Sequence, residues 1–119
     1  MSGAPESSSD WSDFLVEDQR LCVLRSLSEL GGYTANDSSL RTELCARFGH
    51  DLSRSKVREI VHWLFDHGLV DVKISRSAAD PAFGDAKESG LWICTLTGLG
   101  ADIASGRETK KGVGRMSPG

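Results

Sequence analysis

The chain has 119 residues, of which 39% are hydrophobic, and its formal net charge is -3. This length fits one domain with a small core, and the acidic charge excludes a uniformly basic nucleic-acid-binding chain. No apolar run of about 18 residues is present, which excludes a membrane-spanning helix. The first ten residues lack the cationic and apolar regions of a secretory signal, and the three cysteines show no CxxC spacing. We therefore expect a cytoplasmic protein with reduced thiols.

The charge is distributed unevenly along the chain. Residues 1–18 carry five acidic residues and no Lys or Arg, whereas residues 107–119 carry four basic residues and one Glu. The net charge therefore understates how basic one face of the protein can be. From composition we expect a disordered acidic tail over 1–10, one folded domain over 11–106 and a flexible basic tail over 107–119.

Residues 11–30 are expected to form the first helix. Leucines recur there at about helical spacing, at positions 21, 24, 27 and 30, and a pair of glycines follows. Ahead of this stripe, Trp11, Phe14 and Leu15 extend the apolar surface backwards. These three residues either cover the end of the core or contact a second copy of the chain.

The next two helices are expected over 37–48 and 54–67, joined by a short turn. Asn36 or Asp37 can cap the second helix, and the Ser53 hydroxyl can cap the third. Apolar residues at positions 57, 60, 61 and 64 form one stripe of the third helix, and Gly68 ends it. Two helices joined by a short turn, the second with a cationic outer face, are typical of a helix-turn-helix.

Two later runs, 69–74 and 91–96, alternate at period two and indicate antiparallel strands. Turn-forming residues fill the loop between them, and Thr97 can cap a last helix over 98–105. The order of elements predicts a mainly α fold with a small β-hairpin. We interpret it as a winged helix-turn-helix, in the order α-α-α-β-wing-β-α.

In a winged helix-turn-helix, the third helix enters the major groove of double-stranded DNA with its N-terminal half. Its outward candidates for base or phosphate contact are Ser53, Arg54, Ser55, Lys56, Arg58, Glu59 and His62. Arg54 or Arg58 can bind guanine O6 and N7 through two hydrogen bonds. We also expect backbone contacts from Ser39, Arg41, Lys110, Lys111 and Arg115. The loop between the strands has an acidic excess, so the helix and the basic tail should dominate DNA binding.

The sequence offers less for other chemistries. The three histidines and three cysteines show no HxxxH, HExxH or CxxC spacing, and neither GxSxG nor a phosphate-binding glycine loop is present. We therefore expect no metal site, no cofactor, no small-molecule substrate and no enzymatic activity.

Several stretches resemble a known family: EDQRLCVLRSL at 17–27, LCARFGHDLSRSKVREIVHWLFDHGLV at 44–70, TLTGLGADIASGR at 95–107 and the terminal GVGRMSPG. In this order and spacing they are similar to small ArsR-type winged-helix proteins of Mu-like phages and prophages. The resemblance covers about residues 17–119 and implies a regulator-like fold, without an activity to carry over. Metal-sensing ArsR proteins typically bear paired cysteines on the recognition helix, whereas residues 54–67 contain none. A thiolate metal sensor is therefore not expected.

Two functions remain open at this point. The leading hypothesis is a phage or prophage transcription regulator that binds DNA as a homodimer through helices 11–30 and 98–105, because one short helix reads a half-site weakly. The alternative is a winged-helix adaptor that binds proteins during phage assembly or packaging, since a fold does not fix a function. The cations at 54–58 and the basic tail favour the first hypothesis, and the acidic loop favours the second.

Overall fold

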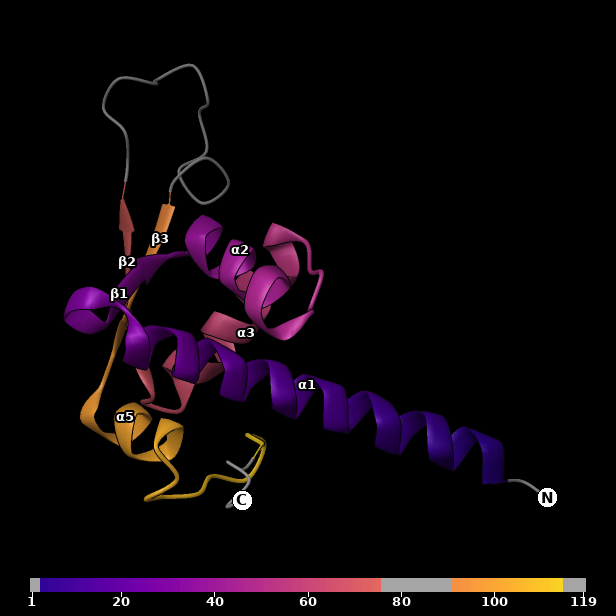
Figure 1. Ribbon diagram of the computed structural model, residues 1–119. Helices are drawn as coiled ribbons and strands as arrows, with labels where there is room; N and C mark the ends of the chain where they lie inside the picture. Colours follow the sequence, from indigo (N-terminus) through magenta and orange to yellow (C-terminus); the bar gives the residue numbers. More distant parts are fainter. Residues whose placement is uncertain (1–2, 76–90, 115–119) are drawn as a thin grey trace.

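The computed structural model describes residues 3–75 and 91–114, which form four α-helices, a short 3-10 helix and a three-stranded sheet (Figure 1). The elements follow in the order α1 (Gly3–Glu29), η1 (Gly31–Tyr33), β1 (Thr34–Asn36), α2 (Asp37–Phe48), α3 (Arg54–Asp66), β2 (Val70–Ser75), β3 (Leu91–Leu96) and α5 (Gly98–Ala104). The protein is thus mainly helical with a small antiparallel sheet, as the sequence predicted at this level.

The sheet has the strand order β1-β3-β2, with both pairings antiparallel. Strand β2 pairs with β3 from Val70 opposite Leu96 to Ser75 opposite Leu91. Strand β1 pairs with the other edge of β3, so a third strand joins the expected hairpin. The sequence does not predict β1, because a strand of three residues is too short to show alternation. The expected loop between β2 and β3 lies outside the described residues, apart from Ser75 at the end of β2.

One hydrophobic core joins the helices to the sheet. Fully buried apolar side chains from α1, α2, α3 and the strands meet in it, among them Leu24, Leu27, Leu40, Leu44, Val57, Val61, Leu64, Val70 and Cys94. The stripe expected on the third helix is confirmed, because all four of its residues are buried. At about 0.8 kcal/mol per buried CH₂ group, this burial fixes which face of α3 points outward.

The helix starts are those that the capping residues predicted. Asn36 accepts from the Ser39 N–H at 2.8 Å, Ser53 from the Lys56 N–H at 3.1 Å, and Thr97 from the Gly100 N–H at 3.1 Å. Each side chain satisfies one backbone donor that the first helical turn leaves without a carbonyl. Gly49 ends α2 in the left-handed conformation, with φ 73°.

The two ends of the chain differ from the expected tails. Helix α1 begins at Gly3, so residues 3–10 are its first turns and not a disordered tail. Pro5 lies in the first turn of the helix, where the backbone N–H that proline lacks would have no hydrogen-bond partner within the helix. Figure 1 shows that the N-terminal half of α1 projects beyond the rest of the molecule.

The basic segment after α5 is packed against α1 as far as Gly114. Val113 is buried in the core, the Gly114 N–H donates to the Glu17 carbonyl at 2.9 Å, and Arg20 donates to the Gly112 carbonyl at 2.8 Å. The expected flexible tail is therefore wrong for residues 107–114, because one apolar residue and backbone hydrogen bonds hold the segment in place. Of the helices in the described part of the chain, none combines the length and hydropathy needed to cross a bilayer.

Candidate functional site

Helices α2 and α3 are joined by a turn whose geometry is fixed at both ends. The His50 N–H donates to the Leu44 carbonyl at 2.9 Å, which closes the end of α2. Ser53 then caps α3, as described above. Arg41 was expected to contact a DNA backbone, but its Nε donates to the Leu52 carbonyl at 2.8 Å and braces this turn. Ser39 is exposed on the first turn of α2.

A fully buried carboxylate organises the face of α3. Asp37, the first residue of α2, receives hydrogen bonds on Oδ2 from Arg54 Nε at 2.9 Å and Arg58 Nε at 2.6 Å. Its Oδ1 accepts from the Trp92 backbone N–H at 3.2 Å. One side chain therefore joins α2, α3 and β3 through charged hydrogen bonds, which are among the stronger ones in proteins.

The protonation state of Asp37 follows from these contacts. Burial by itself raises the pKa of a carboxyl group, because it disfavours the charged form. The hydrogen bonds from Arg54, Arg58 and the Trp92 N–H, with the charge of Arg58, outweigh burial and hold the pKa of Asp37 below its usual value. Asp37 is thus an anion at neutral pH and compensates two cations of α3.

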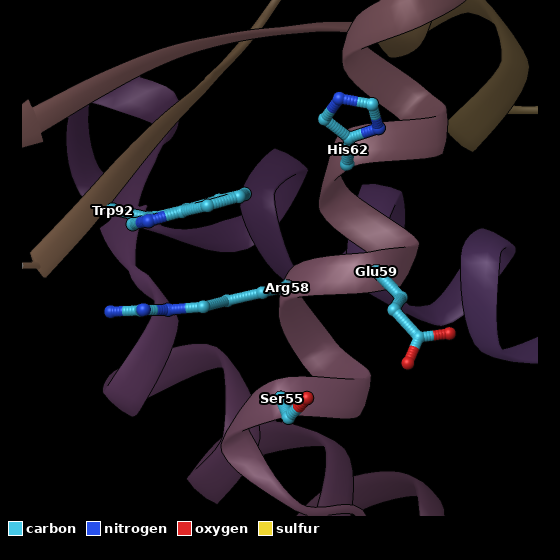
Figure 2. A pocket seen from close by; sticks show the side chains of 5 residues that line it. All are labelled: Ser55, Arg58, Glu59, His62 and Trp92. Carbon is cyan, nitrogen blue, oxygen red and sulfur yellow. The ribbon is translucent and has the colours of Figure 1, made fainter. Parts of the chain in front are cut away.

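The two arginines differ in their access to solvent. The Arg58 side chain is only 13% exposed, and its guanidinium carbon lies 5.1 Å from the centre of the Trp92 ring. Figure 2 shows the Arg58 and Trp92 side chains extending next to each other from α3 and β3. The Arg54 side chain is 39% exposed and can be reached from outside. Arg58 therefore does not project straight into solvent, because Asp37 and Trp92 hold it along the surface; its expected contact with a base stays a prediction.

The remaining expected residues of α3 do lie on one outward face. Ser55, Glu59 and His62 line an open hollow together with Arg58 and Trp92 (Figure 2). Lys56 is partly exposed, and its Nζ lies 3.6 Å from a Glu59 carboxylate oxygen. His62 Nδ1 lies 3.4 Å from an Asp66 carboxylate oxygen. Both are surface pairs, which typically stabilise by less than about 1 kcal/mol and exchange easily for other partners.

Two of the expected tail cations, Lys110 and Lys111, lie on the segment after α5. Lys110 is half-buried and Lys111 is exposed, on the segment whose next residues contact Glu17 and Arg20. Arg115 lies outside the described residues. The structure therefore brings together the expected residues of α3, Arg54, Ser55, Lys56, Arg58, Glu59 and His62. The Arg41 and Arg58 guanidinium groups also make hydrogen bonds within the chain.

Sequence reasoning missed Asp37 as a partner of the arginines, and it also missed a second polar cluster. Asp37 was recognised only as a possible cap, because a sequence does not show which side chains face it across a fold. The second cluster contains Asp18, Cys22 and His50, whose ligand atoms all lie within 4.8 Å of one another. These residue types can bind a metal ion.

Comparison with known proteins gives two relatives. Over 107 residues the chain is 38% identical to a protein of Escherichia phage Mu described as uncharacterized protein gp26. The matched region covers 90% of this chain and 96% of the phage protein. Over 63 residues the chain is 43% identical to an uncharacterized protein of Haemophilus influenzae. This matched region covers 53% of this chain and 60% of the Haemophilus protein. No protein-family model matches the chain, and no solved structure matches it. The relatives thus bear out the phage part of the expected resemblance, and nothing in the comparisons supports its ArsR part. By its identity over nearly the whole length of both proteins, the chain belongs to the family of phage Mu gp26.

Proposed function

We propose that the protein is a winged-helix DNA-binding protein, a phage or prophage transcription regulator that places α3 in the major groove. The observation that carries the proposal is the polar outward face of α3, at whose start the Arg54 guanidinium is held by Asp37. Ser55, Lys56, Glu59 and His62 point away from the core, while Asp37 positions Arg54 at the first residue of the same helix. The capped α2-turn-α3 unit beside a β2–β3 hairpin supports this assignment.

The structure suggests different roles for the cations of α3. Arg54 lies at the helix start and is partly exposed, so it suits a phosphate or a base edge. Lys56 suits a phosphate, since its ion pair with Glu59 is a long surface contact. Arg58 acts as a positioning residue, because its contacts with Asp37 and Trp92 fix the relation of α3 to the sheet.

A mobility-shift experiment tests the proposal. The purified full-length protein is mixed with DNA fragments from its own genome neighbourhood at two salt concentrations. We expect a discrete complex on one fragment that persists at the higher salt. Lys56→Ala should weaken binding to all sequences alike and lower the slope of log K against log salt by about 1.

Arg47→Ala is the matched control for Lys56→Ala, because it also removes one exposed cation but lies in the last turn of α2, where Arg47 pairs with Glu29. It should bind as the wild type does. Equal losses for the two variants would show that any surface charge suffices, and no complex with the wild type would contradict the proposal.

The second candidate function is a protein-interaction adaptor in phage assembly or packaging. The observation in its favour is that Arg54, Lys56 and Arg58 each have a carboxylate partner within the chain. Such pairing reduces the positive potential that attracts DNA. If the mobility shift gives only a smear that disappears with salt, a pull-down from the host lysate becomes the test of this function.

We further propose that the DNA-binding form is a homodimer, and that α1 contributes most of its interface. Phe14 on the projecting half of α1 is 59% exposed. In α5, by contrast, Ile103 and Ala104 are buried within the chain, which leaves Leu99 as its exposed apolar residue. Phe14→Glu should therefore shift the mass measured by light scattering toward the monomer, whereas Phe65→Glu on α3 should not.

A further inference from the structure

A compact cluster of possible metal ligands lies where α1 meets the turn after α2. His50 Nε2 is 2.8 Å from Asp18 Oδ2, and Cys22 Sγ is 3.7 Å from the same oxygen. All the ligand atoms of these three residues lie within 4.8 Å of one another. The cluster therefore places one imidazole nitrogen, one thiol and one carboxylate around a single point.

The backbone holds these three side chains in fixed positions. Asp18 and Cys22 are four residues apart on α1, so their side chains lie on the same face, one turn apart. His50 directly follows Gly49, which ends α2 in the left-handed conformation, and the His50 N–H is bonded to the Leu44 carbonyl. The ligands thus come from α1 and from the turn directly after α2, and α1 and α2 pack together in the core, which lowers the entropy cost of assembling a site.

The burial of the cluster is graded. Cys22 is buried in the core, the His50 side chain is 13% exposed and the Asp18 side chain is 42% exposed. A cation can therefore enter from the Asp18 side and meet the sulfur at the inner end. A water molecule from the exposed Asp18 side would complete the coordination, as in zinc sites with three protein ligands.

We propose that Asp18, Cys22 and His50 bind one thiophilic divalent cation, with Zn²⁺ as the best match. Zn²⁺ takes cysteine sulfur at about 2.3 Å, and histidine nitrogen and carboxylate oxygen at about 2.0 to 2.2 Å. Mg²⁺ and Ca²⁺ prefer sets of oxygen ligands, so a thiol and an imidazole disfavour them. When the cation binds, the Cys22 thiol gives up its proton to solvent, and His50 Nε2 exchanges its contact with Asp18 for a bond to the metal.

The proposed site has a structural consequence that is independent of any DNA-binding role. Asp18 and Cys22 belong to α1, whereas His50 belongs to the turn between α2 and α3. A bound cation would therefore cross-link the long first helix to the segment that leads into α3. The bound form should unfold at a higher temperature than the metal-free form, because the metal binds the folded chain.

Titration of the reduced, metal-free, full-length protein with Co²⁺ tests the site. Co²⁺ replaces Zn²⁺ in such sites and gives a thiolate-to-metal charge-transfer band in the near ultraviolet. We expect this band to saturate at one equivalent of Co²⁺ and to disappear when Zn²⁺ is added. Cys22→Ser should remove the band, and His50→Ala should weaken Co²⁺ binding at least tenfold.

Cys45→Ser is the matched control, because Cys45 is an exposed thiol on α2 outside the cluster. It should keep the band unchanged. If Cys22→Ser fails to fold, Asp18→Asn and His50→Ala at the more exposed positions decide the question, together with the rise in melting temperature that Zn²⁺ causes in the wild type. No charge-transfer band in the wild type, or a band that is lost in Cys45→Ser, would overturn the proposal and leave Asp18 and His50 as a simple hydrogen-bonded pair.

Discussion

Removal of the Arg58 side chain tests the role of the buried Asp37 most sharply. In Arg58→Ala, Asp37 stays fully buried but loses its shorter hydrogen bond, the one of 2.6 Å from Arg58 Nε. Loss of one partner from a buried ion pair costs about 3 to 5 kcal/mol of unfolding free energy. Arg54 still donates to the same carboxylate oxygen, so we expect the lower end of that range, about 3 kcal/mol.

The expected loss is large enough to measure by urea denaturation and by thermal melting. For a domain of this size, 1 kcal/mol corresponds to about 4 °C in melting temperature, so Arg58→Ala should melt about 12 °C below the wild type. Lys56→Ala is the matched control two positions away on α3. Its partner is the exposed Glu59 at 3.6 Å, and its effect should stay within about 0.5 kcal/mol.

A double-mutant cycle separates the Arg58–Asp37 contact from other effects of losing the side chain. Asp37→Asn keeps the shape of the side chain but removes its charge, so Arg58→Ala should cost much less in that background. If Arg58→Ala alone leaves the unfolding free energy within about 0.5 kcal/mol of the wild type, the reasoning is refuted. Arg58 would then be the outward, solvated residue that the sequence pattern first indicated.

Two further predictions concern pH and packing. The pKa of Asp37 is lower in the folded chain than its ordinary value, so the folded state binds the Asp37 proton more weakly than the unfolded state does. The ionised Asp37 carboxylate therefore contributes its full stabilisation above about pH 4, and this stabilisation is lost as the pH falls through the lowered pKa. Melting temperatures measured across this range should therefore fall on acidification, and fall less in Asp37→Asn; equal slopes would contradict the assignment. A Cβ at Gly100 would overlap the Leu69 carbonyl oxygen, whereas one at Gly98 would meet nothing within 4 Å. Gly100→Ala should thus lose about 1 to 3 kcal/mol, and Gly98→Ala in the same helix should lose none, as measured by denaturation.

Local signals in the sequence predicted most of the helical framework. The apolar stripe at 57, 60, 61 and 64 indicated which face of α3 is buried, and hydroxyl or amide side chains marked three helix starts. These features depend on residues within one or two turns of each other, so a single sequence contains them.

Contacts between distant residues were not predictable in the same way. Asp37 of α2 meets Arg54 and Arg58 of α3 and Trp92 of β3, and Asp18 of α1 contacts His50 in the turn after α2. Their side-chain types are common on protein surfaces, and only the packing of α1, α2, α3 and β3 shows that they converge. The segment 107–114 was misread for a related reason, since its composition is polar but Val113 and its backbone hydrogen bonds anchor it.

The most direct test of the central proposal is a residue-by-residue map of the DNA contact. Backbone amide shifts of the ¹⁵N-labelled protein are compared with and without the fragment that it binds in the mobility shift. The largest changes should cluster at residues 53–62, on the outward face of α3, with Arg58 perturbed less than Arg54. Changes confined to α1 or to the β2–β3 hairpin, with α3 unaffected, would contradict the account.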